Sequence, residues 1–422
     1  MGLRRKNDSF GPFEPDLDHA SVGKWNVAVY PPCAARIKSA SRCLAAAAFL
    51  LRGPRSGFKR GRGRKIQSHV RAAGLKGEFA MPVYEGGPSE RYSRQIRFKP
   101  IGEEGQRKLA AGKALIVGMG ALGTVLANHM VRAGVGFVRF VDRDYVEASN
   151  LQRQMLYDED DVRESLPKVV AAKRKLERIN PDVVLEPIVA DVTARNVETL
   201  LEGIDIVLDG TDNFQARFLL NDACYKHGVP FVYGGAVGSR GMTTAFVPHH
   251  TPCLRCLVQP SEDTGETCDR VGVIAPIVDI VASYQTAEAF KLLVGDAGAL
   301  RKSIVTFDVW RNHFYEMKFP EPLADCPTCG KKLYPALEWD EADSVSLCGR
   351  ETVQIRARSS FDLQLWKTRL EPVATVTVNP FLLKAELPEG ERLVLFPDGR
   401  TLVQGTEDPV RAKSLYARYI GL

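Results

Sequence analysis

The sequence predicts an α/β protein with a Rossmann-like, mainly parallel sheet and helices on both faces. A short apolar run, Ala114-Leu-Ile-Val117, leads directly into a glycine turn, Gly118-Met-Gly-Ala-Leu-Gly123. An Ala-rich helical stretch follows to about Arg132, and a second strand ends at Asp142. Strand, glycine turn, helix, strand and acid in this order are typical of a nucleotide-binding β-α-β unit.

The central part of the chain continues this alternation of strands and helices. Strands that alternate with helices favour a parallel sheet, because each crossover between parallel strands is made by a helix. The further elements expected here are a helix at 167–179 and strands near 183–189, 204–208, 230–234 and 243–247.

The last part of the chain has a different pattern, which begins after a break at 333–343 rich in Pro, Glu, Asp and Trp. A turn signal inside it, Pro397-Asp-Gly399, predicts a β-hairpin. We therefore predict a small α+β unit at 344–422. Its expected elements are a strand at 353–357 with period-two alternation, hairpin strands at 393–396 and 400–403, and a helix at 409–420.

The positive charge of the chain is concentrated at its beginning. The 422 residues are 45% hydrophobic and 26% charged, an ordinary globular composition. Residues 1–80 hold 16 Lys and Arg against 5 Asp and Glu, whereas the rest holds 41 and 46. We predict that 1–80 is a disordered extension, followed by a main domain at 81–335. A targeting peptide and a basic arm for nucleic acid are the alternatives to a non-essential extension, which we favour.

No apolar run reaches the roughly 18 to 20 residues that a membrane helix needs. Nine cysteines in so long a chain do not form a disulfide scaffold, and four of them make two C-x-x-C pairs. This usage favours metal binding in a reducing compartment. We therefore expect a cytoplasmic protein with no membrane partner and no nucleic-acid partner.

The glycine turn predicts a bound nucleotide without identifying it. A G-x-G-x-x-G turn lets the backbone approach a phosphate at the N-terminus of a helix. Nicotinamide, flavin, methyl-donor and ATP enzymes all use such a turn. Asp142 lies nineteen residues beyond Gly123, where an acid binds ribose hydroxyls.

The charged residues that follow favour a triphosphate over a hydride donor. Asn150 and Arg153 share one face if their segment is helical. Lys168 begins a helix, where a cation is unfavourable, so an anionic ligand such as a polyphosphate would offset the cost. A solvated surface lysine is the alternative. Asp212 follows an apolar strand and suits Mg²⁺, or it caps the next helix, or both.

These residues together resemble the ThiF/MoeB/HesA family, the bacterial relatives of ubiquitin-activating enzymes. The resemblance covers about 90–333, and the segment from Val345 onward resembles an extension that some members carry. The motifs are Arg91-Tyr-Ser-Arg-Gln-Ile, the glycine turn, Ser149-Asn-Leu-Gln-Arg-Gln154, Thr211-Asp-Asn213 and the two C-x-x-C pairs.

The resemblance implies an ATP-dependent adenylyltransferase. Its substrate would be the C-terminal glycine of a small ubiquitin-like sulfur carrier protein with a diglycine end, prepared for thiocarboxylate formation in thiamin or molybdopterin biosynthesis. A cysteine desulfurase would be a further partner. Attack by a carboxylate develops charge that Arg, Lys and Mg²⁺ stabilise, with little need for a base.

The family's site residues map onto this chain position by position. Arg94 matches an arginine that reaches into the neighbouring subunit's site, which implies a homodimer. Ala121 stands where many members have Gly, and we expect the site to survive if Ala121 stays right-handed. The residues implied to bind Mg-ATP are Gly118, Gly120, Ala121, Gly123, Asp142, Ser149, Asn150, Arg153, Lys168, Asp212 and Asn213, with Arg94, Arg153, Lys168 and Asp212 also catalytic.

The cysteines predict a structural metal and one candidate nucleophile. Cys253 and Cys256, with Cys326 and Cys329, can supply four thiolates to one tetrahedral zinc, which leaves no open position for chemistry. A redox C-x-x-C is the alternative for either pair alone. Cys268 precedes a probable helix and lies near an arginine, so its thiol should ionise more easily. By resemblance it matches the family's reactive cysteine; a small buried residue is the alternative.

Three other functions compete with this interpretation. An NAD-dependent oxidoreductase could use the same glycine turn, and a non-catalytic binding subunit could keep the fold. A related branch of the family adenylylates a carboxylate on modified tRNA. The two C-x-x-C pairs favour the protein carrier.

Overall fold

The computed structural model describes residues 88–258, 271–339, 344–347, 351–357 and 359–421. The predicted extension at 1–80 and the candidate nucleophile Cys268 lie outside these residues. None of the helices in the described ranges is long and apolar enough to cross a membrane.

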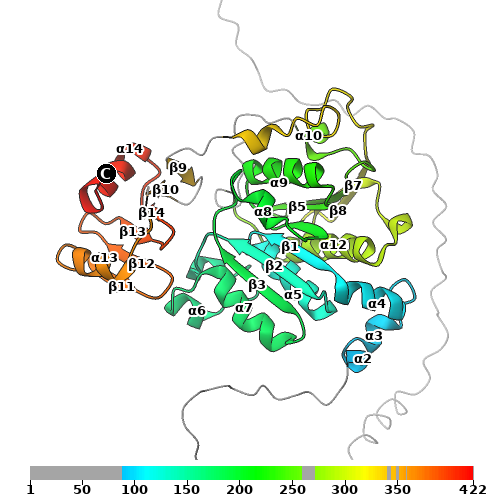
Figure 1. The fold of residues 1–422 in the computed structure, drawn as a ribbon, viewed down its shortest axis with the longest axis horizontal. Coiled ribbons are helices and arrows are strands. Elements are labelled where there is room, and N and C mark those ends of the chain that lie inside the picture. Colours follow the sequence, from blue (N-terminus) through cyan, green and yellow to red (C-terminus); the bar gives the residue numbers. More distant parts are fainter. Residues whose placement is uncertain (1–87, 259–270, 340–343, 348–350, 358, 422) are drawn as a thin grey trace, which may run out of the picture. The chain divides into compact units, whose positions relative to one another are not determined.

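The core of the protein is an eight-stranded sheet with the order β3-β2-β1-β4-β5-β6-β7-β8 (Figure 1). The strands from β3 to β5 pair in parallel, and those from β5 to β8 pair antiparallel. The predicted Rossmann-like, mainly parallel fold is confirmed. The strands are β1 (Lys113–Val117), β2 (Phe137–Asp142), β3 (Val184–Val189), β4 (Ile206–Asp209), β5 (Phe231–Val237), β6 (Arg240–Phe246), β7 (Ser303–Asp308) and β8 (His313–Lys318).

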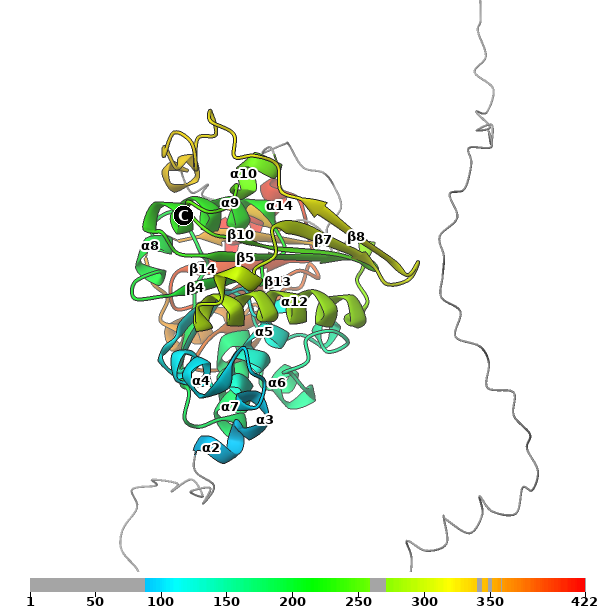
Figure 2. The same ribbon diagram turned by 90° about the vertical axis from the view of Figure 1, so that its right-hand side faces the viewer.

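Helices cover both faces of this sheet, as Figure 2 shows edge-on. Strand β1 illustrates why, because its successive side chains alternate between two apolar cores. Ala114 and Ile116 pack in the core under the first set of helices, and Leu115 and Val117 in the core under the second. The first set is α4 (Gly102–Ala111), α5 (Ala121–Ala133), α7 (Lys168–Ile179) and α12 (Ala275–Val294); the second is α8 (Val197–Leu200), α9 (Phe214–His227) and α10 (Leu254–Leu257).

The antiparallel end of the sheet is where the structure departs from simple alternation. Strands β5 and β6 are joined through Gly238, whose φ of +61° lies in the left-handed region that favours glycine. So short a connection leaves no room for a helix, so β6 must run back along β5. The remaining short elements are α2 (Pro88–Arg91), α3 (Ser93–Ile96), α6 (Glu159–Arg163) and the 3₁₀ turns η1 (Ala148–Asn150), η2 (Ala297–Ala299) and η3 (Pro335–Glu338).

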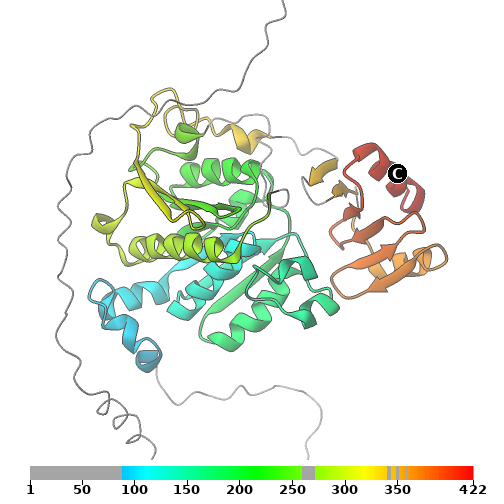
Figure 3. The ribbon, with the colours of Figure 1, turned by 180° about the vertical axis from the view of Figure 1, so that it is seen from behind.

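The C-terminal segment forms the predicted α+β unit, seen from behind in Figure 3. Its six strands are antiparallel in the order β11-β12-β13-β14-β10-β9. The predicted hairpin is β13–β14, and Gly399 at its turn has a φ of +89°. The elements are β9 (Ser344–Leu347), β10 (Thr352–Arg356), α13 (Leu363–Leu370), β11 (Thr375–Val378), β12 (Leu383–Glu386), β13 (Arg392–Leu395), β14 (Arg400–Gln404) and α14 (Pro409–Tyr419).

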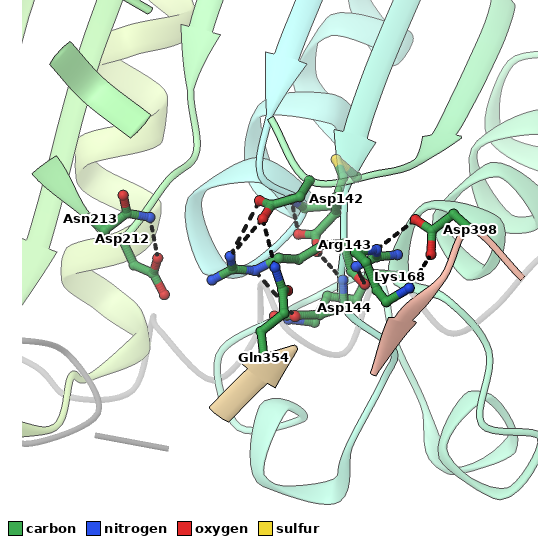
Figure 4. Close-up of polar contacts among 11 residues, drawn as sticks. Asp142, Arg143, Asp144, Lys168, Asp212, Asn213, Gln354 and Asp398 are labelled. Carbon is green, nitrogen blue, oxygen red and sulfur yellow. Dashed lines mark hydrogen bonds and ion pairs between the residues drawn. The ribbon is translucent and has the colours of Figure 1, made fainter. Parts of the chain in front are cut away.

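This unit contacts the segments that follow β2 and β3. The Arg400 guanidinium is fully buried and donates to the carbonyl oxygen of Arg143 at 3.0 Å. Gln354 on β10, labelled in Figure 4, donates at 3.1 Å to the carboxylate of Asp191, just after β3. Tyr145 packs into a small apolar cluster with Val394 of β13, Leu402 of β14, and Leu382 and Phe396 beside the strands.

Candidate active site and metal centre

The glycine turn at the end of β1 is shaped by contacts that exclude side chains. A Cβ on Gly118, which has a φ of +89°, would lie 2.6 Å from the carbonyl oxygen of Gly210. A Cβ on Gly123 would lie 1.9 Å from the carbonyl oxygen of Gly118. Both positions therefore require glycine, and α5 is held tightly against the turn.

The backbone N–H groups in the first turn of α5 donate no hydrogen bond to a capping side chain. Gly120 is the N-cap residue, and it has no side chain to accept from the first N–H groups. Ala121 is the first helical residue and is not among the residues with positive φ. It therefore keeps the right-handed conformation that the site requires, and its N–H remains a donor.

Asp142 at the end of β2 supports the turn from below. Its Oδ2 accepts from the N–H of Met119 at 2.6 Å, and its Oδ1 from the N–H of Asp144 at 2.7 Å. The hydroxyl of Tyr157 donates to the Met119 carbonyl at 2.7 Å. Burial raises the pKa of the Asp142 carboxyl, and the positive charge of Lys168 opposes this rise. Asp142 thus fixes the backbone of the turn. The sequence predicts a different role for it, the binding of the ribose.

Lys168, the first residue of α7, is 4% exposed. Its Nζ lies 3.1 Å from Oδ2 of Asp144, and the pair is shown in Figure 4. The alternative of a solvated surface lysine is therefore wrong. The structure also changes the electrostatic argument, because Asp144 already offsets part of the cost of a cation at a helix N-terminus.

Ser149 and Asn150 lie in a 3₁₀ turn, and Arg153 lies in the further turn that follows it, so the helical spacing assumed for this segment holds only in its first residues. Asn150 lies in η1, and its carbonyl oxygen accepts from the N–H of Arg153 at 3.1 Å. The Arg153 guanidinium donates to the carbonyl oxygen of Ser149 at 2.9 Å. The Asn150 side chain is buried and accepts from the N–H of Glu147 at 3.1 Å. Asn150 therefore also shapes its own turn.

In the loop after β4, the residue that caps the next helix is Asn213 and not Asp212. Asn213 is the N-cap of α9, because its side chain accepts from the N–H of Ala216 at 2.8 Å. The alternative in which Asp212 caps this helix is therefore wrong. Asp212 is exposed, and its Oδ1 accepts from the Asn213 amide at 3.4 Å (Figure 4).

A buried ion pair holds this loop in place. The Arg217 guanidinium on α9 donates to Oδ2 of Asp209 at 3.0 Å and to the carbonyl oxygens of Thr211 and Gly234 at 2.8 and 3.0 Å. Burial raises the pKa of Asp209, and the charge of Arg217 opposes this rise. Asp209 and Arg217 therefore position Asp212.

The predicted residues thus gather at the carboxyl ends of three adjacent strands. Strand β1 carries the glycine turn, β2 carries Asp142 and β4 leads to Asp212, and β1 lies between the other two. This is the crevice where open α/β sheets bind ligands. Arg94 lies elsewhere, exposed on α3.

Reasoning from the sequence missed three supporting side chains. Asp144 and Arg217 are described above. Gln154 is 3% exposed, and no partner for its Oε1 is found among the described residues. Its Nε2 lies 3.8 Å from the place of a Cβ on Gly120. Gln154 stands inside the Ser149–Gln154 motif, so its position in the motif was the available signal.

The four predicted metal ligands meet in one cluster. The Sγ atoms of Cys253, Cys256, Cys326 and Cys329 all lie within 4.8 Å of one another. Cys253 and Cys326 are 3.5 Å apart, Cys256 and Cys329 3.3 Å, and Cys253 and Cys256 4.0 Å. Zinc–sulfur bonds of about 2.3 Å in a tetrahedron place sulfurs about 3.8 Å apart. The cluster therefore fits one zinc ion.

Comparisons with known proteins show which family the chain is similar to. The model of the ThiF family matches residues 92–328. A sulfur carrier protein ThiS adenylyltransferase of Bacillus subtilis is 46% identical over 336 residues, which cover 78% of this chain and 99% of the relative. A molybdopterin-synthase adenylyltransferase of Escherichia coli is 37% identical over 242 residues, or 57% of this chain and 96% of the relative.

The fold is also found among solved structures. The crystal structure of Escherichia coli MccB superposes with a TM-score of 0.50 at 22% identity, covering 58% of this chain and 74% of MccB. The family model matches more than half of the chain, and the Bacillus subtilis relative aligns over nearly its whole length. The protein therefore belongs to the ThiF family.

Proposed function

We propose that the protein is an adenylyltransferase that uses Mg-ATP to activate the C-terminal glycine of a ubiquitin-like sulfur carrier protein. The observation that carries the proposal is the gathering of Asp142, Lys168 and Asp212 around the glycine turn, in a chain of the ThiF family. The relatives named above are adenylyltransferases by name, which leaves the oxidoreductase and tRNA alternatives without support.

The reaction forms one bond and breaks one bond at the α-phosphorus. A carboxylate oxygen of the carrier's terminal glycine attacks, the bond to the β-phosphate oxygen breaks, and pyrophosphate leaves. A glycine carboxylate is already ionised at neutral pH, so no side chain must remove a proton. The protein's contribution is positioning and charge stabilisation.

Each part of the site has a role in this scheme. The N–H groups at the start of α5 hold phosphate oxygens beside Gly118, Gly120, Ala121 and Gly123. Asp142 accepts from the ribose hydroxyls, and Lys168 neutralises charge on the phosphates. We assign Ser149, Asn150, Arg153 and Asn213 to the binding of the nucleotide as well. Asp212 would hold Mg²⁺, which would supply further neutralisation of phosphate charge when bound.

Arg94 completes the site from the neighbouring subunit of a homodimer. Arg94 is exposed on α3, and its neighbour Gln95 donates to the carbonyl oxygen of Ala133 at the C-terminal end of α5, the end away from the glycine turn, which supports action on another copy. The four cysteines hold a structural zinc ion, since four thiolates leave no open coordination position.

A ThiS-type carrier, as in thiamin biosynthesis, fits better than a molybdopterin-type carrier. The match to the ThiS adenylyltransferase covers 78% of this chain, against 57% for the molybdopterin-synthase enzyme. It is longer than the family match at 92–328 and so extends beyond it. A cysteine desulfurase is then the partner from which the sulfur atom of the thiocarboxylate comes.

The test is pyrophosphate exchange into ATP with a candidate carrier protein present. Exchange should require both the carrier and Mg²⁺, and Asp212→Ala should reduce it by about 10²-fold or more. A carrier that lacks its terminal glycine is the control. Exchange without carrier, or an Asp212→Ala variant that exchanges like the wild type, would overturn the proposal.

A further inference from the structure

One carboxylate on α9 is bonded to both cysteine pairs. Asp222 is fully buried, and each of its oxygens accepts several hydrogen bonds. Oδ1 accepts from Nε of Arg255 at 3.0 Å and from the hydroxyl of Thr328. Oδ2 accepts from Nη2 of Arg255 at 2.9 Å and from the N–H of Ala336 at 2.8 Å.

The positions of these donors in the chain give the contacts their meaning. Arg255 is the third residue of Cys253-Leu-Arg-Cys256, and Thr328 is the third residue of Cys326-Pro-Thr-Cys329. The side chain at the third position of each C-x-x-C pair therefore donates a hydrogen bond to the same carboxylate, that of Asp222. Some 70 residues separate the two pairs in the chain, and Asp222 joins them through side chains alone.

The neighbours of Asp222 on α9 add backbone contacts to the first pair. Asn221 accepts from the N–H of Leu254 at 2.8 Å, and the hydroxyl of Tyr225 donates to the carbonyl oxygen of Pro252 at 2.8 Å. Pro252 and Leu254 are the two chain neighbours of Cys253. The Arg255 guanidinium also lies 4.7 Å from the ring centre of Phe218, one turn earlier on α9.

We propose that Asp222 is a positioning residue of the metal centre, which holds the two C-x-x-C pairs in the geometry that binds the metal. The inference rests on the zinc site of the proposed function. Four thiolates repel one another when they converge, so a site that is held together by other bonds binds metal more tightly and releases it more slowly. Asp222 supplies such bonds from outside the ligand set.

A structural role alone would predict a different result. Breaking a buried ion pair costs stability wherever the pair lies in the fold. Glu288 on α12 offers a matched control, because it is fully buried, pairs with Lys291 at 2.6 Å and accepts from the N–H of Arg301 at 3.0 Å. It lies on the other face of the sheet from the cysteines.

The experiment measures the rate at which zinc leaves the full-length, zinc-loaded protein for a colorimetric chelator in excess. We expect Asp222→Asn to release zinc about 10- to 100-fold faster than the wild type, the usual effect of losing a partner outside the ligand set. Glu288→Gln should unfold at a lower temperature yet release zinc at the wild-type rate.

A milder pair of variants covers the case in which Asp222→Asn does not fold. Thr328→Val removes one donor to Asp222 and keeps the side-chain volume and all four cysteines. Thr286→Val removes a buried hydroxyl that donates within α12 and serves as its control. Thr328→Val should release zinc several-fold faster, and Thr286→Val should not.

Two outcomes separate the inference from the proposal beneath it. Zinc release at the wild-type rate from Thr328→Val, and from any Asp222→Asn that folds, would overturn the role of Asp222 and leave the zinc site intact. A folded wild-type protein that takes up no zinc would overturn the metal site itself, and this inference with it.

Discussion

The ammonium nitrogen of Lys168 lies 3.1 Å from Oδ2 of Asp144, and both side chains are largely buried. Asp144 stands two residues after Asp142, whose Oδ1 accepts from the N–H of Asp144. The cation that we assign to the triphosphate is therefore held in place before the nucleotide arrives. Such preorganisation is what makes charge stabilisation effective in an active site.

Replacing either member of this pair should lower activity to different extents. Lys168→Ala removes the charge itself and should reduce carrier-dependent pyrophosphate exchange by about 10²- to 10³-fold. Asp144→Asn keeps Lys168 but not its orientation, and should cost about 10-fold. Lys173→Ala removes a partly exposed lysine of the same helix and is the control. Equal activity in Lys168→Ala and Lys173→Ala would contradict this assignment.

The two glycines at the start of α5 should respond differently to alanine. A methyl group on Gly123 meets the carbonyl oxygen of Gly118 at 1.9 Å, so Gly123→Ala should cost about 3 kcal/mol of unfolding free energy or more. A methyl group on Gly120 meets nothing nearer than Gln154 at 3.8 Å. Gly120→Ala should therefore fold but bind ATP more weakly.

Urea unfolding and ATP titration of both glycine variants measure these two effects separately. A Gly123→Ala protein as stable as the wild type would show that the helix can move away from the turn.

The action of Arg94 across a dimer can be tested by mixing two inactive variants. Arg94→Ala lacks the arginine that it offers to its neighbour, and Asp212→Ala lacks its own metal ligand. A mixed dimer keeps one complete site, so randomly reassorted subunits should recover about a quarter of the wild-type activity. No recovery after confirmed reassortment would place Arg94 in the site of its own chain.

If four cysteines hold one zinc ion, replacing a single one of them should abolish zinc binding. Wild-type protein should contain about one zinc per chain, measured by elemental analysis, and Cys256→Ser should contain none. Its thermal unfolding temperature should fall, because zinc joins a loop after β6 to a segment after β8. Cys224→Ser, at a buried cysteine of α9 outside the cluster, is the control. Metal retained in Cys256→Ser would refute this ligand set.

The stability of the C-terminal unit should depend on pH through Lys384. Burial lowers the pKa of this lysine to about 8, with Arg392 adding to the effect. Between about pH 8 and 10.5 the unfolded chain then binds more protons than the folded one, so stability from this group rises with pH. Below pH 8 the folded state carries the full cost of the buried charge.

Lys384→Met should therefore be more stable than the wild type at pH 7, and the gain should shrink as the pH approaches 10.5. Urea unfolding at pH 7 and pH 10 measures the difference, with Lys413→Met, an exposed lysine of α14, as control. A gain that stays constant with pH would exclude Lys384 as its source.

Local patterns were enough to predict the elements that carry the site. The apolar run at 114–117, the glycine turn and Asp142 mark a unit whose parts are neighbours in the chain. Strands at 184–189 and 206–209 and the helix at 168–179 were found within about two residues of the expected bounds. The antiparallel strands β7 and β8 were not predicted, and β6 began three residues early, since pairing with a neighbour decides where a strand begins.

Contacts between residues far apart in the chain could not be predicted from the sequence. Lys168 was singled out from the sequence as a candidate ligand of the phosphates, but nothing in the pattern shows that Asp144 is its partner. Asp222 belongs to no motif, and Arg255 lies inside a C-x-x-C motif whose pattern gives its middle residues no role, so both were passed over. Their importance comes from burial, which makes an unpaired charge costly and so forces each to find a partner across the fold.

The sequence by itself determined which chemical groups the protein owns: a turn without side chains, a set of charges suited to a nucleotide, and four thiols in two pairs. Spacing along the chain records these because turns and helices are local structures. The tertiary structure decided which of those groups face one another and which are held by unforeseen partners. Such pairings depend on sheet order and helix packing, and these arise from the summed burial of the whole core.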